Sequence, residues 1–151
     1  CWAHVIRDLV AIAERPGASA EFGAQLLELQ KQLFGQWHQY KNGSIDWLTL
    51  QQGSRPIRQR FVAVLERIVV LGIERGERTP WAKTLQTCQR LSKLADGLWT
   101  FLETPGIEPT NNAAERALRQ TMIQRKISDG VQSAEGPLCR SRLLTATNNL
   151  R

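Results

Sequence analysis

One carboxylate of this sequence stands in a setting where it could do chemistry. Glu115 lies in the segment Asn111-Asn112-Ala113-Ala114-Glu115-Arg116-Ala117-Leu118-Arg119. On a helix, Asn112, Glu115 and Arg119 fall at i, i+3 and i+7 on one polar stripe, and Arg116 stacks above Asn112. The pattern therefore predicts a single carboxylate in the first turn of a helix, surrounded by amides and arginines.

A purely structural interpretation of the same residues is open. Asn112 and Glu115 have the spacing of a capping box, in which the asparagine caps the helix and the glutamate reaches back to its amide. Glu115 and Arg119 also have the spacing of an ion pair, which stabilises a helix by only a few tenths of a kcal/mol. The pattern alone favours this structural interpretation.

The segment also resembles the signature around the last acidic residue of the insertion-sequence sixty-six transposases, which are DDE transposases. Cys1 to Leu9 is similar to the Cys-Trp-Ala-His segment that follows the second catalytic aspartate of that family. Arg125-Lys126-Ile127-Ser128 and the loop from Gln132 to Gly136 resemble the downstream block. Order and separation match, so the resemblance covers essentially the whole chain.

The resemblance implies a catalytic role for Glu115. It implies an RNase H-like core whose two aspartates and one glutamate hold two Mg²⁺ or Mn²⁺ ions for phosphodiester cleavage, chemistry that suits hard oxygen ligands. Glu115 would be the third carboxylate ligand, with Asn111 and Asn112 as supporting residues. The residues implied to contact DNA are Arg116, Arg119, Arg125 and Lys126.

The chain departs from the family pattern in its other acidic residues. Both catalytic aspartates would lie before Cys1, and Asp8, Asp46, Asp96 and Asp129 do not occupy matching positions. We therefore expect a fragment of a transposase that cleaves and joins DNA ends, inactive by itself. The expected partners are DNA, further copies of the protein and accessory proteins of the element, in the cytoplasm.

Helical periodicity dominates the chain, and alternating strand patterns are nearly absent. The predicted fold is mainly α: a helical insertion plus C-terminal helices of an RNase H-like core whose strands lie upstream. The predicted organisation is a core helix in 1–18, the helical insertion in 19–104 and the returning core segment in 105–151. Helices are expected at about 2–15, 19–41, 45–75, 80–94, 98–102, 112–124 and 138–150.

Several positions carry specific predictions within these helices. Ser19 is predicted to cap the second helix, with Glu21 in its first turn, and Asn42-Gly43 to stop it. Pro56 is predicted to restart or kink the third helix. Thr79 and Pro80 have the pattern of a cap followed by proline at the first helical position. The buried stripes are predicted to include Leu71 and Leu94, and most of the five tryptophans are expected to be packing anchors.

The charge and cysteine content limit the classes of partner and compartment. A net charge of +6 favours a polyanionic partner, although a basic but inert surface is an open alternative. Residues 104–151 are about twice as basic per residue as the rest and so are the favoured phosphate-facing surface. Three cysteines form no paired framework, and no apolar run is long enough to span a membrane.

Two further interpretations compete with a transposase fragment. One is a non-catalytic helical module for DNA binding or oligomerisation, in which Arg55, Arg58 and Arg60 form a basic cluster; a solvated helix face is the alternative for these arginines. The other is a pseudogene remnant whose missing sheet would leave apolar side chains exposed, namely Trp2, Leu9, Leu118 and Leu143.

Overall fold

The computed structural model describes residues 1–73, 76–112, 119, 123 and 135–149, which divide between two compact units, 1–110 and 111–151. Each unit is described by itself. The described residues form helices and connecting turns, with no strand among them. The prediction of a mainly α chain is thereby confirmed. The RNase H-like strands expected upstream of Cys1 stay a prediction.

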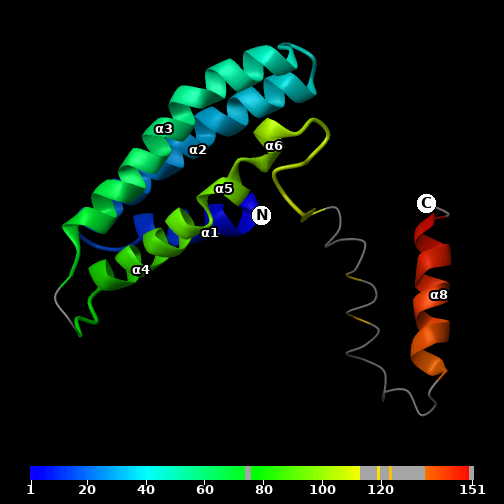
Figure 1. Cartoon of the computed structure of the whole chain (residues 1–151). Coiled ribbons are helices and arrows are strands. Elements are labelled where there is room, and N and C mark those ends of the chain that lie inside the picture. The colour runs from blue at the N-terminus through cyan, green and yellow to red at the C-terminus, as the bar shows by residue number, and fades with distance from the viewer. Residues whose placement is uncertain (74–75, 113–118, 120–122, 124–134, 150–151) are drawn as a thin grey trace. The chain divides into compact units, whose positions relative to one another are not determined.

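Unit 1 is built on a long hairpin of two helices, α2 (Ala18–Lys41) and α3 (Trp47–Leu71) (Figure 1). Helix α1 packs against α2, and α4 packs mainly against α3, so the four helices enclose one apolar core. Two short helices then bring the chain back across α3. In chain order the helices are α1 (Trp2–Ala13), α2 (Ala18–Lys41), α3 (Trp47–Leu71), α4 (Pro80–Lys93), α5 (Ala95–Leu98) and α6 (Thr100–Glu103).

Side-chain caps fix where α3 and α4 begin. The Asp46 carboxylate accepts a hydrogen bond from the Thr49 backbone N–H at 2.7 Å. Hydrogen bonding to the Thr49 side chain, and then to its backbone, holds the pKa of Asp46 below its ordinary value. The Thr79 hydroxyl accepts from the Ala82 N–H at 3.2 Å, with Pro80 as the first helical residue, which confirms the predicted cap.

Two predictions about helix interruptions were wrong or only partly met. Helix α2 begins at Ala18, after Gly17 at a φ of 68°, and Ser19 is buried inside the helix with its hydroxyl 2.9 Å from that of Thr84. Ser19 therefore serves a tertiary contact and not a cap. Helix α3 continues through Pro56, so it does not restart there. Helix α2 does end at Lys41, as the following Asn42-Gly43 predicts.

The apolar stripes of the long helices form the core almost as predicted. The side chains buried along α2 are Phe22, Leu26, Leu29, Leu33 and Trp37. The predictions fail at the ends of α3 and α4, where Leu71 is 62% exposed and Leu94 is 63% exposed. Helix α3 ends at Leu71 because Gly72 turns the backbone at a φ of 60°, which carries the chain away from the packed face.

Trp2 is the centre of an aromatic cluster in this core. Its ring lies 5.5–5.7 Å, centroid to centroid, from Phe34, Phe61 and Trp99, in edge-to-face geometry. Its indole N–H donates to the Leu98 carbonyl at 2.7 Å. Trp2 is 2% exposed and Leu9 is 0% exposed, so the expectation that a missing sheet would expose them was wrong. The helices of unit 1 bury both residues.

Helices α1 and α2 approach so closely that one position of α2 admits no side chain. A Cβ atom placed on Gly23 would lie 2.4 Å from the Ala13 backbone nitrogen. Backbone atoms cannot move aside as a flexible side chain can, so Gly23→Ala is expected to lower the free energy of unfolding by about 1–3 kcal/mol. Urea denaturation followed by circular dichroism measures the change.

Gly35 offers a matched control in the same helix. A Cβ at Gly35 would meet no atom within 4 Å. Gly35→Ala should therefore raise the free energy of unfolding by up to about 1 kcal/mol, since alanine is the better helix former. Changes of the same sign in the free energy of unfolding for Gly23→Ala and Gly35→Ala would contradict the close approach of α1 and α2.

Unit 2 contains α8 (Gly136–Asn149), which confirms the predicted final helix. Leu138 and Leu143 are exposed on it, at 54% and 63%. Leu143 thus meets the expectation of exposure, whereas Leu118 lies outside the described residues. None of the described helices of either unit is long and apolar enough to cross a membrane.

Candidate functional site

Within unit 1, two contacts hold the residues that lead into the Asn111–Arg119 signature. The backbone N–H of Trp2 donates to the carbonyl of Pro109 at 2.9 Å, and Pro109 is buried. Next to it, the Lys41 ammonium lies 2.6 Å from the Glu108 carboxylate, and this contact raises the pKa of Lys41. The start of α1 and the end of α2 therefore hold Glu108 and Pro109, the residues that lead into the signature.

The described part of the signature is polar and exposed. Asn111 and Asn112 are exposed, and Asn112 is the first residue of the signature in helical conformation. Arg119 is helical and exposed as well. Most of the helix predicted from about Asn112 to Gln124 falls outside the described residues, so that helix stays a prediction. Glu115, Arg116, Arg125 and Lys126 lie outside the described residues, so the capping box and the polar stripe stay predictions.

Two of the aspartates of unit 1 have structural surroundings. Asp46 caps α3, and Asp8 lies 3.9 Å from the Arg90 guanidinium. Within the described ranges, no three His, Cys, Asp or Glu side chains gather as a group able to hold a metal ion.

The three arginines of the predicted basic cluster do not share one site. Arg55 and Arg58 both line a surface hollow of about 350 Å³ between α3 and α6, together with Gln51 and Glu103. Arg60 does not line it, because five residues along a helix turn the side chain by about 140° from Arg55. Of the predicted basic cluster, Arg55 and Arg58 therefore line this hollow together and Arg60 does not.

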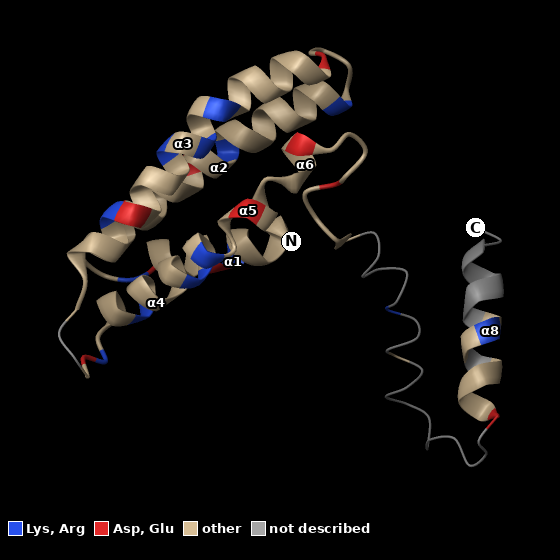
Figure 2. Ribbon diagram, in the orientation of Figure 1, with Lys and Arg blue, Asp and Glu red and all other residues tan. Residues whose placement is uncertain are grey.

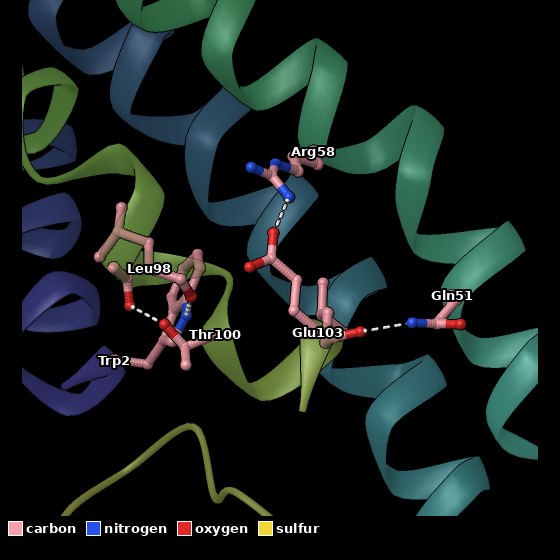
Figure 3. Close-up of polar contacts among 8 residues, drawn as sticks. Trp2, Gln51, Arg58, Leu98, Thr100 and Glu103 are labelled. Carbon is pink, nitrogen blue, oxygen red and sulfur yellow. Dashed lines mark hydrogen bonds and ion pairs between the residues drawn. The ribbon is translucent and has the colours of Figure 1, made fainter. Parts of the chain in front are cut away.

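Within that pair, Arg58 is already engaged (Figure 3). Its guanidinium lies 2.7 Å from the Glu103 carboxylate and 5.5 Å from the centroid of the Trp99 ring. Gln51 also reaches across, and its amide N–H donates to the Leu102 carbonyl at 3.0 Å. These contacts tie α6 to α3, which assigns Arg58 a structural role and leaves little positive charge in the hollow.

The cysteines differ in reactivity. Burial raises the pKa of the Cys88 thiol from about 9 to about 11, partly opposed by the charge of Arg15, whereas Cys1 and Cys139 are exposed. We expect two thiols to react quickly with a disulfide reagent at neutral pH and the third only on unfolding, because the thiolate is the nucleophile. Three fast thiols in the folded chain would contradict the burial of Cys88.

Burial of Cys88 also makes stability depend on pH. Since the folded state keeps the Cys88 proton to a higher pH than the unfolded state, the free energy of unfolding should fall as the pH rises from about 9 toward 11.

Comparison with known proteins assigns the chain to a class. Residues 1–137, which include all of unit 1 and the whole signature, match the family model described as Transposase IS66 family. The chain is thus of the transposase class, and it belongs to the IS66 transposase family. No curated protein and no solved structure matches it significantly.

Proposed function

We propose that this chain supplies the helical unit and the final metal-binding carboxylate of a transposase that cleaves and joins DNA ends. The observation that carries the proposal is family membership over residues 1–137, which include Glu115 within the signature. The bond from the Trp2 backbone N–H to the Pro109 carbonyl adds support, since it joins the beginning of α1 to a residue two positions before the signature. Under this proposal, residues from distant parts of the sequence that would flank the active site are held together by this bond.

The donor chemistry fits a hard divalent cation. Glu115 offers carboxylate oxygens, and Asn111 and Asn112 offer amide oxygens, the ligand types that Mg²⁺ and Mn²⁺ prefer. One carboxylate is too few for two ions, so the site requires the two aspartates that the family pattern places before Cys1. When bound, the ions would supply charge stabilisation at the attacking and leaving oxygens of the phosphodiester.

The basic residues of the signature have a separate part in this proposal. Arg116 and Arg119 stand one and four residues after Glu115, and Arg125 and Lys126 follow at the end of the predicted helix. Their charges would hold the phosphates of a DNA end beside the carboxylate. Joining two ends at one target also requires more than one active site, so we propose that the complete protein works as a multimer.

A metal-dependence experiment tests the proposal. A transposase that contains this chain and the two upstream aspartates should cleave a duplex carrying its element end with Mg²⁺ or Mn²⁺. EDTA should remove that activity, and added Mg²⁺ should restore it. The 151-residue chain alone should bind metal weakly by calorimetry and cleave nothing. Cleavage that persists in EDTA, or cleavage by the chain alone, would overturn the proposed donor set.

A further inference from the structure

The outward side of α4 carries cations and no carboxylate. Lys83, Arg90 and Lys93 lie at i, i+7 and i+10, which places them on one side of the helix, and all three are exposed. The charged segments of the α4 ribbon are basic (Figure 2). Helix α4 contains no Asp or Glu. Its other side packs into the core of unit 1 through Ala82, Leu85, Cys88 and Leu91.

Arg15, which follows α1, joins these cations at a shared hollow. The hollow measures about 460 Å³, and its lining includes Arg15, Lys83, Arg90 and Lys93 with the amides of Gln86 and Gln89. Arg15 Nη1 donates to the Thr84 hydroxyl at 2.8 Å, and that hydroxyl is 0% exposed and lies 2.9 Å from the Ser19 hydroxyl. The guanidinium is thus held in place at the edge of the hollow, with further N–H donors directed elsewhere.

Helix electrostatics explain only part of this arrangement. Arg90 and Lys93 lie in the last turn of α4, where the macrodipole favours cations. Lys83 lies in the first turn, where the macrodipole disfavours a cation. The macrodipole therefore does not account for Lys83, which extends the charged surface toward the N-terminal end of α4.

Asp8 compensates the charge of Arg90 only weakly. Asp8 Oδ2 lies 3.9 Å from Arg90 Nη2, at the long limit of an ion pair, and the Arg90 side chain is 70% exposed. Exposed pairs of this kind are weak. No carboxylate lines the hollow.

We propose that the α4 basic face, defined as Arg15, Lys83, Arg90 and Lys93, binds the phosphate backbone of duplex DNA independently of sequence. Lys83 and Lys93 are about 15 Å apart along the helix axis, the rise of roughly four nucleotides of one strand. Two amide side chains between them add neutral donors of the kind that contact phosphate oxygens. The choice of DNA among polyanions rests on the proposed function, whereas the affinity for phosphate rests on the charges alone.

The test is DNA binding by the full chain without divalent metal. Fluorescence anisotropy with a short labelled duplex of mixed sequence, in EDTA and over a series of salt concentrations, gives the slope of log affinity against log salt. Lys83→Gln with Arg90→Gln is expected to lower that slope by about 2, since each phosphate contact contributes about 0.9. Glutamine keeps the helix propensity, and circular dichroism verifies that α4 is intact.

A matched pair of substitutions separates this face from net charge. Lys31→Gln with Arg60→Gln removes the same two kinds of charge from exposed positions on α2 and α3, and it should leave the slope nearly unchanged. Equal losses from both pairs, no loss from the α4 pair or no binding by the unaltered chain would each overturn the inference. So would displacement of the duplex by polyglutamate as effectively as by unlabelled DNA, since that would indicate an acidic polypeptide as partner. The metal-dependent cleavage assay stands apart from all these outcomes.

Discussion

Glu115→Gln in a transposase that contains this chain is expected to reduce cleavage and strand transfer by at least about 10³-fold. Removing one preorganised stabiliser of transition-state charge costs on the order of 10²–10³ in rate, and a lost metal ligand also weakens ion binding. Glutamine is nearly isosteric, so the fold should be retained. Single-turnover strand transfer at saturating Mg²⁺ measures the loss, and thermal unfolding measures the fold.

Two control substitutions give that result its meaning. Glu28→Gln removes the same charge from an exposed position on α2, where the carboxylate accepts a hydrogen bond from Gln32, and it should leave activity unchanged. Arg119→Gln addresses the structural interpretation. If Glu115 merely paired with Arg119, the two substitutions would have equal effects of about 0.2–0.5 kcal/mol on stability and little on activity.

The outcome that contradicts the assignment of Glu115 is therefore specific. Undiminished strand transfer in Glu115→Gln, with a stability change equal to that of Arg119→Gln, would make this glutamate a structural residue that pairs with Arg119. The metal site would then have to be built from other carboxylates. A loss of activity with unchanged unfolding would support metal binding, since capping and ion pairing act on stability.

Helical periodicity predicted most of the fold because it reports directly on burial. The stripe from Phe22 to Trp37 follows the spacing of one helix face, and the structure buries it. Periodicity fails at helix ends, where the backbone direction decides. Gly72 turns the chain and leaves Leu71 outside, and Gly17 lets α2 begin before Ser19. Turns of this kind depend on tertiary contacts such as that of Ser19 with Thr84, which a sequence pattern does not contain.

The candidate site was predictable to a different extent in each part. Glu115 was found through family resemblance, and its spacing alone favours a cap. The α4 basic face was not predicted, because the apolar stripe of this helix indicates only its buried side. The spacing of Lys83, Arg90 and Lys93 could have revealed it. The contribution of Arg15 was beyond prediction, since only folding brings it to Thr84, 69 positions away.

Trp2→Ala is expected to lower the free energy of unfolding of unit 1 by about 3–5 kcal/mol. The substitution removes a ring that contacts Phe34, Phe61 and Trp99 and leaves a cavity among them. It also leaves the Leu98 carbonyl without its indole donor. Domains are stable by only about 5–15 kcal/mol, so a large share of the stability would be lost. Urea denaturation followed by tryptophan fluorescence and circular dichroism measures it.

Two further variants separate the causes of that loss. Trp2→Phe keeps an aromatic ring and removes the N–H donor, so a smaller loss of about 1–3 kcal/mol is expected. Leu48→Ala truncates an apolar side chain that is 59% exposed, and it should change stability by less than about 0.5 kcal/mol. A loss below about 1 kcal/mol for Trp2→Ala would contradict the packing of α1, because fraying of a terminal helix is the alternative. The backbone N–H of Trp2 donates to the Pro109 carbonyl, so such fraying would also release the segment that leads to Glu115.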